Sequence, residues 1–465
     1  MAISNKFKFF LSAFFFASII VNITSCNENN AQNAENEGWE ELFNGQDLTG
    51  WRLINGNADY RVEEGAIVGT TVTESPNSFL ATENEYGDFI LEFDFFLDNE
   101  INSGVQFRSI HDPNIKEGKV HGYQFEFDPS DRSWTGGIYD EQRRGWLYPL
   151  TLNPAGQQAF KKGEWNKARI EAIGPSIRTW INGIPVASLE DDLTKKGIIA
   201  LQVHSIGDDS DAGKEIKWRN IRIKTSDLTH DPDHTAFVVN FIPNSLTERE
   251  KEQGWELLWD GKTEAGWKGA HKDDFPEKGW EMNDGVLTVQ ESGGGESEHG
   301  GDIVTEKQYG AFDLQLQFQL TEGANSGIKY FVTEREEVGK ASAIELEYQL
   351  LDDEKHPDAK KGREGNRTLA SLYDLIPSKK ENRFIRPIGE WNHARIIVSP
   401  DKKVEHWLNG IKVLEYERGS QEYRNLVANS KYKKWENFGE ADKGWILLQD
   451  HGNTVHFRSI KIREL

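Results

Sequence analysis

Polar side chains alternate with aromatic ones in residues 123–128, whose sequence is Tyr-Gln-Phe-Glu-Phe-Asp. Successive side chains of a β-strand point to opposite faces, so the aromatic ones are expected to face a core. Gln124, Glu126 and Asp128 would then share the other face. A carboxylate beside an amide can hydrogen-bond sugar hydroxyls and transfer protons. The alternative interpretation is a set of polar side chains that are only solvated.

The same pattern recurs in residues 344–350, where Glu345, Glu347 and Gln349 alternate with apolar residues. Each of these segments is followed, further along the chain, by an amide and an imidazole two residues apart. These pairs are Gln202 with His204 and Gln449 with His451. If the strands are neighbours, a carboxylate, an amide and an imidazole converge twice. A histidine with a purely structural role is the alternative, but recurrence at matching parity favours a site.

The elements that must position these groups belong to an internal repeat. Five blocks recur in the same order, and the distance between copies grows from 216 residues at Trp39 and Trp255 to 247 residues at His204 and His451. Insertions in loops of the second copy explain this growth. The blocks begin at Trp39, Asn102, Gly163, Trp180 and Leu201, and again at Trp255, Asn325, Gly389, Trp407 and Leu448.

The repeat and the period-two patterns predict two all-β domains, each made of two antiparallel sheets packed face to face. Asn182-Gly183 and Asn409-Gly410 stand between strand-like runs and suit tight hairpin turns. The predicted domains are residues 38–228 and 251–465, joined by a connector of residues 229–250. Thr247 and Glu250 have the spacing of a capping box, which predicts a short helix in the connector.

The first 26 residues resemble a bacterial lipoprotein signal peptide. Lys6 and Lys8 precede an apolar run, which is too short to span a membrane comfortably and ends before Ile-Thr-Ser-Cys. Cys26 is the only cysteine, so no disulfide can form within one molecule. We expect an exported protein, lipid-anchored through Cys26 in the cell envelope, with residues 27–37 as a tether. The sequence does not distinguish the periplasm from the outer-membrane surface.

Composition limits the partners. The chain has 77 acidic and 54 basic residues, a formal net charge of −23, which disfavours a nucleic-acid partner. Metal and nucleophile motifs are absent from the sequence, and no cofactor is predicted. A single divalent ion held by a carboxylate and an imidazole is compatible with the residues, but no spacing demands it. Gly293-Gly294-Gly295, in an acidic loop, is interpreted as a flexible spacer.

The combined motifs resemble the 3-keto-disaccharide hydrolase family. The motifs that carry the resemblance include Leu-Phe-Asn-Gly at 42–45, Asn-Ser-Gly at 102–104 and 325–327, Thr-Gly-Gly-Ile-Tyr at 135–139, Glu-Tyr-Gln at 347–349, and Leu-Gln-Asp-His-Gly at 448–452. They cover nearly the whole chain after residue 37. The resemblance implies two tandem concanavalin A-like jelly rolls and a role in carbohydrate processing.

The resemblance also implies a chemistry. A ketone at C3 acidifies the C2 proton, so a glycoside can be cleaved by elimination across C2 and C1 and then hydrated. This requires a base, a group that stabilises the enolate, and an acid for the departing oxygen. The catalytic candidates are His204, Glu126, His451 and Glu347, with Arg108 or Lys329 as the enolate stabiliser. The substrate-binding candidates are Asn102, Arg108, Gln124, Asp128, Tyr139, Gln202, Asn325, Lys329, Gln349, Tyr373, His406 and Gln449.

Each copy departs from the family pattern. The Glu-x-Gln order of the second copy is reversed as Gln124 and Glu126 in the first, and Arg108 is aligned with Phe331. The Tyr373 motif lacks its glycines. The sequence therefore leaves open which copy is active, and a non-catalytic glycan-binding lipoprotein remains the alternative function.

Overall fold

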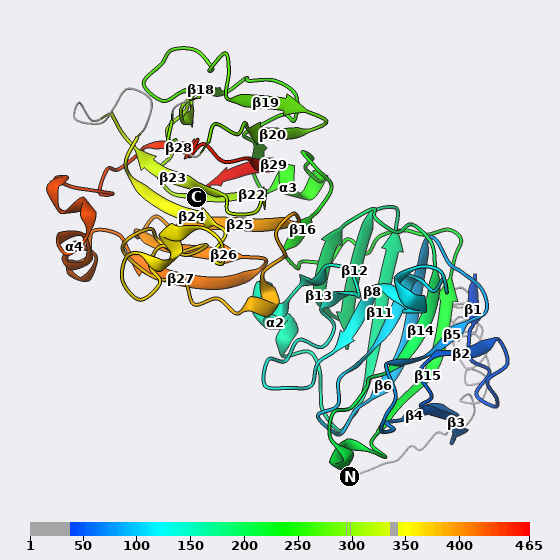
Figure 1. Ribbon diagram of the computed structural model, residues 1–465. Helices are drawn as coiled ribbons and strands as arrows, with labels where there is room; N and C mark the ends of the chain where they lie inside the picture. Colours follow the sequence, from blue (N-terminus) through cyan, green and yellow to red (C-terminus); the bar gives the residue numbers. More distant parts are fainter. Residues whose placement is uncertain (1–37, 294, 298, 335–342) are drawn as a thin grey trace, which may run out of the picture.

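The computed structural model describes residues 38–293, 295–297, 299–334 and 343–465, which form two β-sandwiches joined by a short connector (Figure 1). The predicted signal peptide, Cys26 and the tether lie outside the described residues. Within the described part of the chain, no helix combines the length and the apolar character needed to cross a membrane.

The first sandwich packs a nine-stranded sheet against a seven-stranded sheet. The larger sheet has the order β16-β13-β12-β11-β6-β15-β4-β3, with β1 also paired to β15, and the smaller has the order β10-β9-β8-β7-β14-β5-β2. The bounds are β1 (Trp39–Glu41), β2 (Trp51–Asn55), β3 (Asp59–Glu63), β4 (Ala66–Thr70), β5 (Ser78–Thr82), β6 (Phe89–Phe96), β7 (Ser103–Ile110), β8 (His121–Phe127), β9 (Ile138–Glu141), β10 (Gly145–Tyr148), β11 (Trp165–Ile173), β12 (Ser176–Ile181), β13 (Ile184–Glu190), β14 (Ile198–Val203), β15 (Glu215–Lys224) and β16 (Val238–Asn240).

The second sandwich repeats this plan with an eight-stranded and a five-stranded sheet. Their orders are β19-β20-β29-β22-β25-β26-β27, with β17 paired to β29, and β18-β21-β28-β23-β24. The bounds are β17 (Glu256–Leu257), β18 (Trp267–Gly269), β19 (Trp280–Asn283), β20 (Val286–Val289), β21 (Ile303–Thr305), β22 (Phe312–Leu320), β23 (Asn325–Val332), β24 (Leu346–Leu351), β25 (Trp391–Val398), β26 (Lys403–Leu408), β27 (Ile411–Glu417), β28 (Trp445–Leu448) and β29 (Val455–Glu464).

Among the described residues, helical structure is confined to short segments. The α-helices are α2 (Pro154–Gln157), α3 (Glu248–Glu252) and α4 (Gln421–Ala428). Single 3-10 turns lie at Lys116–Gly118, Leu150–Leu152, Asp209–Asp211, Pro357–Lys360, Asn382–Phe384 and Lys431–Lys434. The prediction of two tandem all-β, concanavalin A-like jelly rolls is therefore confirmed.

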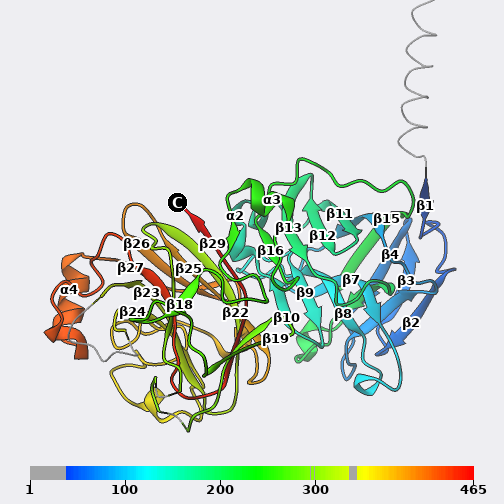
Figure 2. The same ribbon diagram turned by 90° about the horizontal axis from the view of Figure 1, so that it is seen from above.

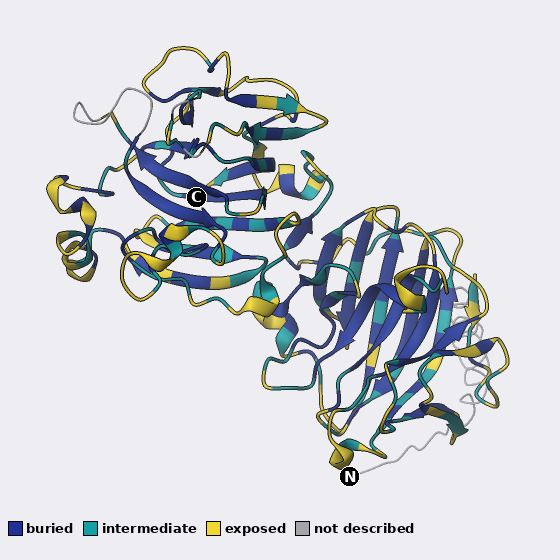
Figure 3. Cartoon of the chain, viewed as in Figure 1, coloured by how far each residue is buried: buried dark blue, intermediate teal, exposed yellow. Residues whose placement is uncertain are grey.

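Alternate side chains of β8 and β24 face the core as the sequence predicted, although residues on both faces of these strands are buried (Figure 3). Tyr123, Phe125 and Phe127 are fully buried in the core of the first sandwich. Leu346, Tyr348 and Leu350 are buried in the core of the second sandwich. The polar residues between them therefore lie on the outer faces of β8 and β24.

The predicted hairpins join β12 to β13 and β26 to β27. Asn182 and Gly183 have φ values of 52° and 78°, and Asn409 and Gly410 have 49° and 80°. A two-residue turn with positive φ at both positions matches the right-handed twist of the flanking strands. Asn and Gly tolerate this conformation at low cost, which explains why both copies use them.

The connector is packed against both sandwiches, which lie side by side (Figure 2). Its strand β16 pairs in parallel with β13 of the first sandwich. Its helix α3 carries the predicted capping box between Thr247 and Glu250. Glu250 also accepts hydrogen bonds from Asn240 on β16 and from Lys461 on β29 of the second sandwich. One buried carboxylate therefore links β16, which pairs with the first sandwich, to β29 of the second sandwich.

Candidate functional site

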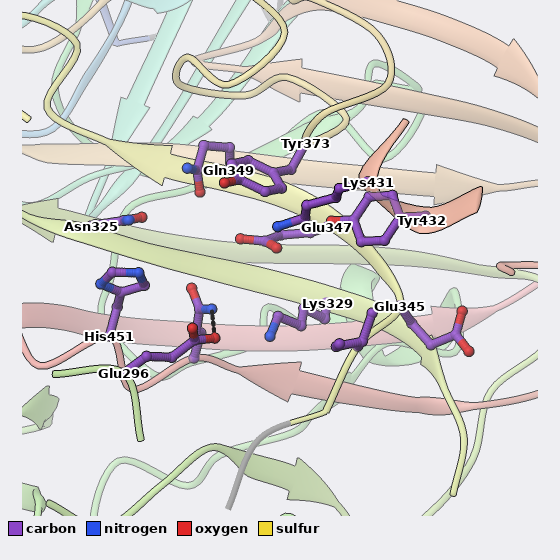
Figure 4. Close-up of a pocket in the computed structure, with 12 residues that line it drawn as sticks. Glu296, Asn325, Lys329, Glu345, Glu347, Gln349, Tyr373, Lys431, Tyr432 and His451 are labelled. Atoms are coloured by element: carbon purple, nitrogen blue, oxygen red, sulfur yellow. Dashed lines mark hydrogen bonds between the residues drawn. The ribbon is translucent and has the colours of Figure 1, made fainter. Parts of the chain in front are cut away.

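A cavity of about 300 Å³ lies on the outer face of the five-stranded sheet in the second sandwich (Figure 4). We call it the Glu347 pocket. It is lined by Glu296, Asn325, Lys329, Ile344, Glu345, Glu347, Gln349, Tyr373, Lys431, Tyr432, Gln449 and His451. Seven of the predicted second-copy site residues are among these twelve, and they come from β23, β24, the loop after β24 and the end of β28.

Strands β23 and β24 form one wall of the pocket. Lys329 on β23 is directly opposite Glu347 on β24, and Gly327 is opposite Gln349. A Cβ atom at Gly327 would come within 2.4 Å of a Glu347 carboxylate oxygen. Glycine therefore allows the Glu347 side chain to lie across β23 toward the centre of the pocket.

Gln449 and His451 enter the pocket from the residues that follow β28. The sequence suggested that the amide–imidazole segment would neighbour the carboxylate strand, but β23 lies between β28 and β24. The residues still converge, because all three strands present the same face. In Figure 4, Glu347, Gln349 and Tyr373 lie on one side of the pocket, and His451 and Glu296 lie on the other.

A buried lysine dominates the charge of the pocket. Lys329 Nζ donates to the Ala343 carbonyl at 2.7 Å and lies 3.5 Å from a carboxylate oxygen of Asp302. Burial disfavours its charge, but Asp302 and Glu347 more than offset this effect and raise the pKa of Lys329. Lys329 is therefore a permanent cation at neutral pH.

Glu347 has a proton affinity suited to proton transfer near neutral pH. Burial raises its pKa to about 7, even though Lys329 and Lys431 favour the carboxylate. Lys431 is itself affected by burial, which lowers its pKa. A carboxyl group that titrates near pH 7 can accept a proton and return it under physiological conditions.

Several buried polar atoms of the pocket have no hydrogen-bond partner among the described residues. They are Asn325 Oδ1, Gln449 Oε1 and His451 Nδ1. Buried polar groups are nearly always paired, so three unpaired groups around one cavity indicate a polar ligand. The amide nitrogen of Gln449 donates to Glu296 at 3.3 Å, which leaves its oxygen available.

Tyr373 occupies the position of Tyr139 in the first sandwich. Its neighbour Ala370 takes a φ of 64° where the first copy has Gly136 with 90°, so the backbone path survives loss of the glycine. The Tyr373 hydroxyl donates to Asp358 at 2.6 Å, and Lys431 Nζ lies 4.1 Å from its ring centroid. Tyr373 therefore still lines the pocket although its motif lacks the glycines.

Three pocket residues were missed by the sequence analysis. Glu296 follows the glycine run that was interpreted as a spacer. The loop is held by hydrogen bonds from Ser297 N to the Asp450 carbonyl and from Ser292 N to the Gly452 carbonyl. Lys431 and Tyr432 belong to the insertion after β27 that contains α4. An insertion has no counterpart in the other copy, so the repeat comparison could not find them.

The equivalent surface of the first sandwich is chemically different. Gln106 is opposite Gln124 where the second sandwich pairs Lys329 with Glu347. Gln106 donates to Gln124, which donates to Glu126 at 2.6 Å, and Asn102 also donates to Glu126. These four side chains are therefore hydrogen-bonded to one another. Burial raises the pKa of Glu126 to about 7, but no lysine faces it at the strand position that Lys329 occupies in the other copy.

The other first-copy candidates are partly engaged in local contacts. Asp128 is paired with Arg132 at 2.8 Å, and His204 Nδ1 lies 2.7 Å from the Ser205 carbonyl oxygen. The Tyr139 ring packs edge-on against Trp146. Gln202 alone has both amide atoms buried without a partner among the described residues.

The structure corrects the sequence prediction for Arg108 and His406. The Arg108 guanidinium is buried and bonds Asp88 and the carbonyls of Gly87, Gly174 and Ala172, so it has a structural role. His406 is fully buried between the two sheets of the second sandwich. Its ring nitrogens contact the Tyr330 hydroxyl at 2.8 Å and the Ala370 carbonyl at 3.0 Å. Its assignment as a binding residue rested on the family resemblance, and the structure places its side chain in the core.

No group of three or more His, Cys, Asp or Glu within the described ranges could hold a metal ion. The single divalent ion held by a carboxylate and an imidazole, which the sequence left open, would need only two protein ligands, so it stays a prediction.

Comparisons with known proteins agree with the repeat. The model of the 3-keto-alpha-glucoside-1,2-lyase-like domain matches twice, at residues 38–224 and 254–463. A 3-keto-disaccharide hydrolase of Bacteroides thetaiotaomicron is 38% identical over 232 residues, which are 46% of this chain and 79% of that protein.

Solved structures also resemble single sandwiches of the chain. A candidate glycosyl hydrolase from Parabacteroides distasonis is 31% identical, with a TM-score of 0.42, over 48% of this chain and 99% of its own. A second one from that organism is 26% identical, with a TM-score of 0.33, over 43% of this chain and 99% of its own. The two matches to the family model span most of the sequence. Both sandwiches of this chain therefore belong to the 3-keto-alpha-glucoside-1,2-lyase-like domain family.

Proposed function

We propose that the protein cleaves the glycosidic bond of 3-keto-disaccharides or related 3-keto glycosides, and that the second sandwich carries the reaction. The family membership and the name of the Bacteroides relative support the substrate class. The observation that carries the assignment to the second sandwich is the pairing of buried Lys329 with Glu347 across β23 and β24. The first sandwich has two glutamines at these positions.

The reaction proceeds by elimination and hydration. The base removes the proton from C2 of the 3-keto sugar, and the C–H electrons pass through the enolate to form the C1–C2 double bond. The C1–O bond breaks, and its oxygen takes a proton and leaves as an alcohol. Water then adds its hydroxyl to C1 and a proton to C2, which releases the free 3-keto sugar. The sum is hydrolysis of one glycosidic bond.

Glu347 and His451 are the base and the acid of this scheme. Glu347 titrates near neutral pH, and His451 has a ring nitrogen without a partner among the described residues. Lys329 donates to the ketone oxygen as negative charge develops on it. A fixed cation in a site with little water stabilises an enolate more strongly than water does. Asn325, Gln349 and Gln449 hold sugar hydroxyls.

The test is to offer the purified protein 3-keto-trehalose, 3-keto-sucrose and both unoxidised parents, and to follow released monosaccharide. Release only from the keto sugars is expected. Glu347→Gln and His451→Ala should lower kcat by at least ~100-fold, in the usual range for a general acid or base. Glu126→Gln removes the carboxylate of the first-copy surface and His204→Ala removes the equivalent of His451; both variants should retain activity. Binding without release, unaffected by the histidine variants, would instead identify a glycan-binding protein.

We also propose that the chain is exported and lipid-anchored through Cys26. The signal-like segment before Ile-Thr-Ser-Cys supports this proposal. Labelled fatty acid should be incorporated into the wild-type protein and not into Cys26→Ala, which should leave the membrane fraction.

A further inference from the structure

A second cavity of about 310 Å³ lies on the same face of the five-stranded sheet. We call it the Trp445 cavity. The lining residues that matter here are Lys268, Val304, Val332, Thr333, Ala343 and Trp445. These residues have no role in the proposed reaction steps.

The Trp445 cavity is next to the Glu347 pocket along β28. Trp445, Leu447 and Gln449 alternate with the core residues Ile446 and Leu448, so they share the outer face. Lys329 is opposite Leu447, and Trp445 is opposite Val332. At ~3.3 Å per residue, Trp445 therefore lies roughly 7 Å along the strand from the level of Lys329.

Ala343 lies between the two cavities. It lines the Trp445 cavity, and its carbonyl oxygen accepts the hydrogen bond from Lys329 Nζ at 2.7 Å. A ligand whose reacting bond lies at Lys329 could therefore extend over Ala343 to Trp445 without crossing to another face.

The floor of the Trp445 cavity is apolar and its rim is polar. Trp445 is partly exposed and packs against a buried cluster of Ala270, Val304, Val332, Ala343 and Leu447. Its indole nitrogen donates to the Glu306 carbonyl at 3.3 Å, which fixes the ring, and Lys268 Nζ lies 5.6 Å from the ring centroid. A fixed aromatic face with polar groups around it suits a ligand with an apolar face and a hydroxylated edge, as a pyranose ring has.

The corresponding surface of the first sandwich has no aromatic floor. The residue equivalent to Trp445 is Ile198, which is opposite Ser109 as Trp445 is opposite Val332. Ile198 is only 4% exposed and packs with Ile54, Phe79 and Val120. Phe79 takes the strand position of Asp302, the partner of Lys329. The aromatic floor and the lysine–aspartate pair therefore occur together in one sandwich and are replaced together in the other.

We infer that the Trp445 cavity binds the leaving-group sugar of a 3-keto-disaccharide, stacked on the Trp445 indole. This inference rests on the proposed function, since it extends the same site by one subsite. It predicts a preference for disaccharides over glycosides whose leaving group is small.

The test compares two substrates in the full-length protein. With 3-keto-trehalose, Trp445→Ala should lower kcat/KM about tenfold, which is the size of one good aromatic contact. With the methyl glycoside of 3-keto-glucose, kcat/KM should stay within about twofold of wild type because no second ring is present. Trp445→Phe should recover most of the loss. Trp391→Ala is the control, since Trp391 is a partly exposed tryptophan on the other sheet of the same sandwich.

An equal loss with both substrates, or no loss with 3-keto-trehalose, would overturn the inference. Calorimetry separates this result from failure of the proposed function. If wild type cleaves neither substrate, the affinity for 3-keto-trehalose is measured in Glu347→Gln with and without Trp445→Ala. Weaker binding in the double variant still supports the subsite, and equal affinity refutes it.

Discussion

Lys329 and Glu347 lie directly opposite each other on β23 and β24, and the equivalent residues of the first sandwich are Gln106 and Gln124. The two copies have therefore kept the same strand register. Only the second copy has a lysine and a glutamate opposite each other at these positions. The cation and the titrating carboxylate that elimination needs are both in the second sandwich.

Replacing Lys329 by the first-copy residue tests the role of the cation. Lys329→Gln should lower kcat on 3-keto-trehalose by at least ~100-fold, as loss of one donor to a developing oxyanion does. The variant also leaves Asp302 buried without its cation, so thermal unfolding must be measured. Lys329→Gln combined with Asp302→Phe restores the first-copy pair and should recover stability but not activity. Activity in the stable double variant would contradict the proposed role.

The raised pKa of Glu347 predicts a pH profile. If the carboxylate is the base, kcat/KM should rise with pH and level off above about pH 7. Glu347→Gln should remove most of the rate and this dependence. The profile is measured with the methyl glycoside and 3-keto-trehalose, and a flat profile between pH 5 and 8 would exclude Glu347 as the titrating group.

The same pKa predicts a change in stability with pH. Native Glu347 binds its proton more tightly than the unfolded chain does, so its effect on stability becomes less favourable as pH rises from about 4.5 to about 7. At ~1.36 kcal/mol per pKa unit, the loss is up to about 3 kcal/mol. The free energy of unfolding of Glu347→Gln, measured with denaturant, should not show this decrease. The stability of the variant relative to wild type should therefore increase between pH 5 and pH 8.

His406 should matter for stability and little for catalysis. His406→Leu removes a buried partner of the Tyr330 hydroxyl and the Ala370 carbonyl, at a cost of about 1–3 kcal/mol. The folded variant should keep kcat within about threefold of wild type. A far larger loss of kcat with normal stability would return His406 to the site.

Acid pH should reduce the contribution of His406 to the free energy of unfolding. Burial lowers its pKa from 6.5 to about 4, so the unfolded chain takes up this proton first as pH falls. The histidine therefore contributes its full stability above about pH 6.5 and loses it progressively toward pH 4. The stability difference between wild type and His406→Leu, measured by denaturant unfolding, should narrow over that range.

Glu250 should couple the two sandwiches. Glu250→Gln leaves Lys461 buried without its carboxylate and should cost about 3 kcal/mol, the range for breaking a buried pair. Thr247→Ala removes only the helix cap and should cost about 1 kcal/mol. Calorimetric unfolding that separates into two transitions in Glu250→Gln, and not in Thr247→Ala, would show loss of coupling. Equal effects would contradict the role of the pair.

Period-two patterns and the repeat predicted the fold because they report directly on burial. Residues 123–128 and 344–350 have the expected faces, and Thr247 caps the expected helix. Parity also placed Glu347, Gln349 and His451 on one surface. His406 was taken as a binding residue from the family resemblance alone, and the structure places it in the core.

Residues in loops and insertions had no periodic signal. Glu296, Lys431 and Tyr432 reach the Glu347 pocket through tertiary packing that follows neither strand parity nor the repeat. Asp302 was missed for a related reason, since the first copy has Phe79 in its place. Comparing the sequences of the two copies identifies residues that both copies share. It cannot identify residues that occur in one copy only.

The parallel pairing of β16 with β13 sets the limits for separating the two sandwiches. A truncated protein that ends at residue 228, the predicted end of the first domain, would leave β13 as an uncovered edge with free backbone donors and acceptors. Such edges recruit strands from other molecules and promote aggregation. A soluble single-sandwich fragment should therefore extend beyond Asn240, so the connector up to β16 belongs to the first domain as a structural unit.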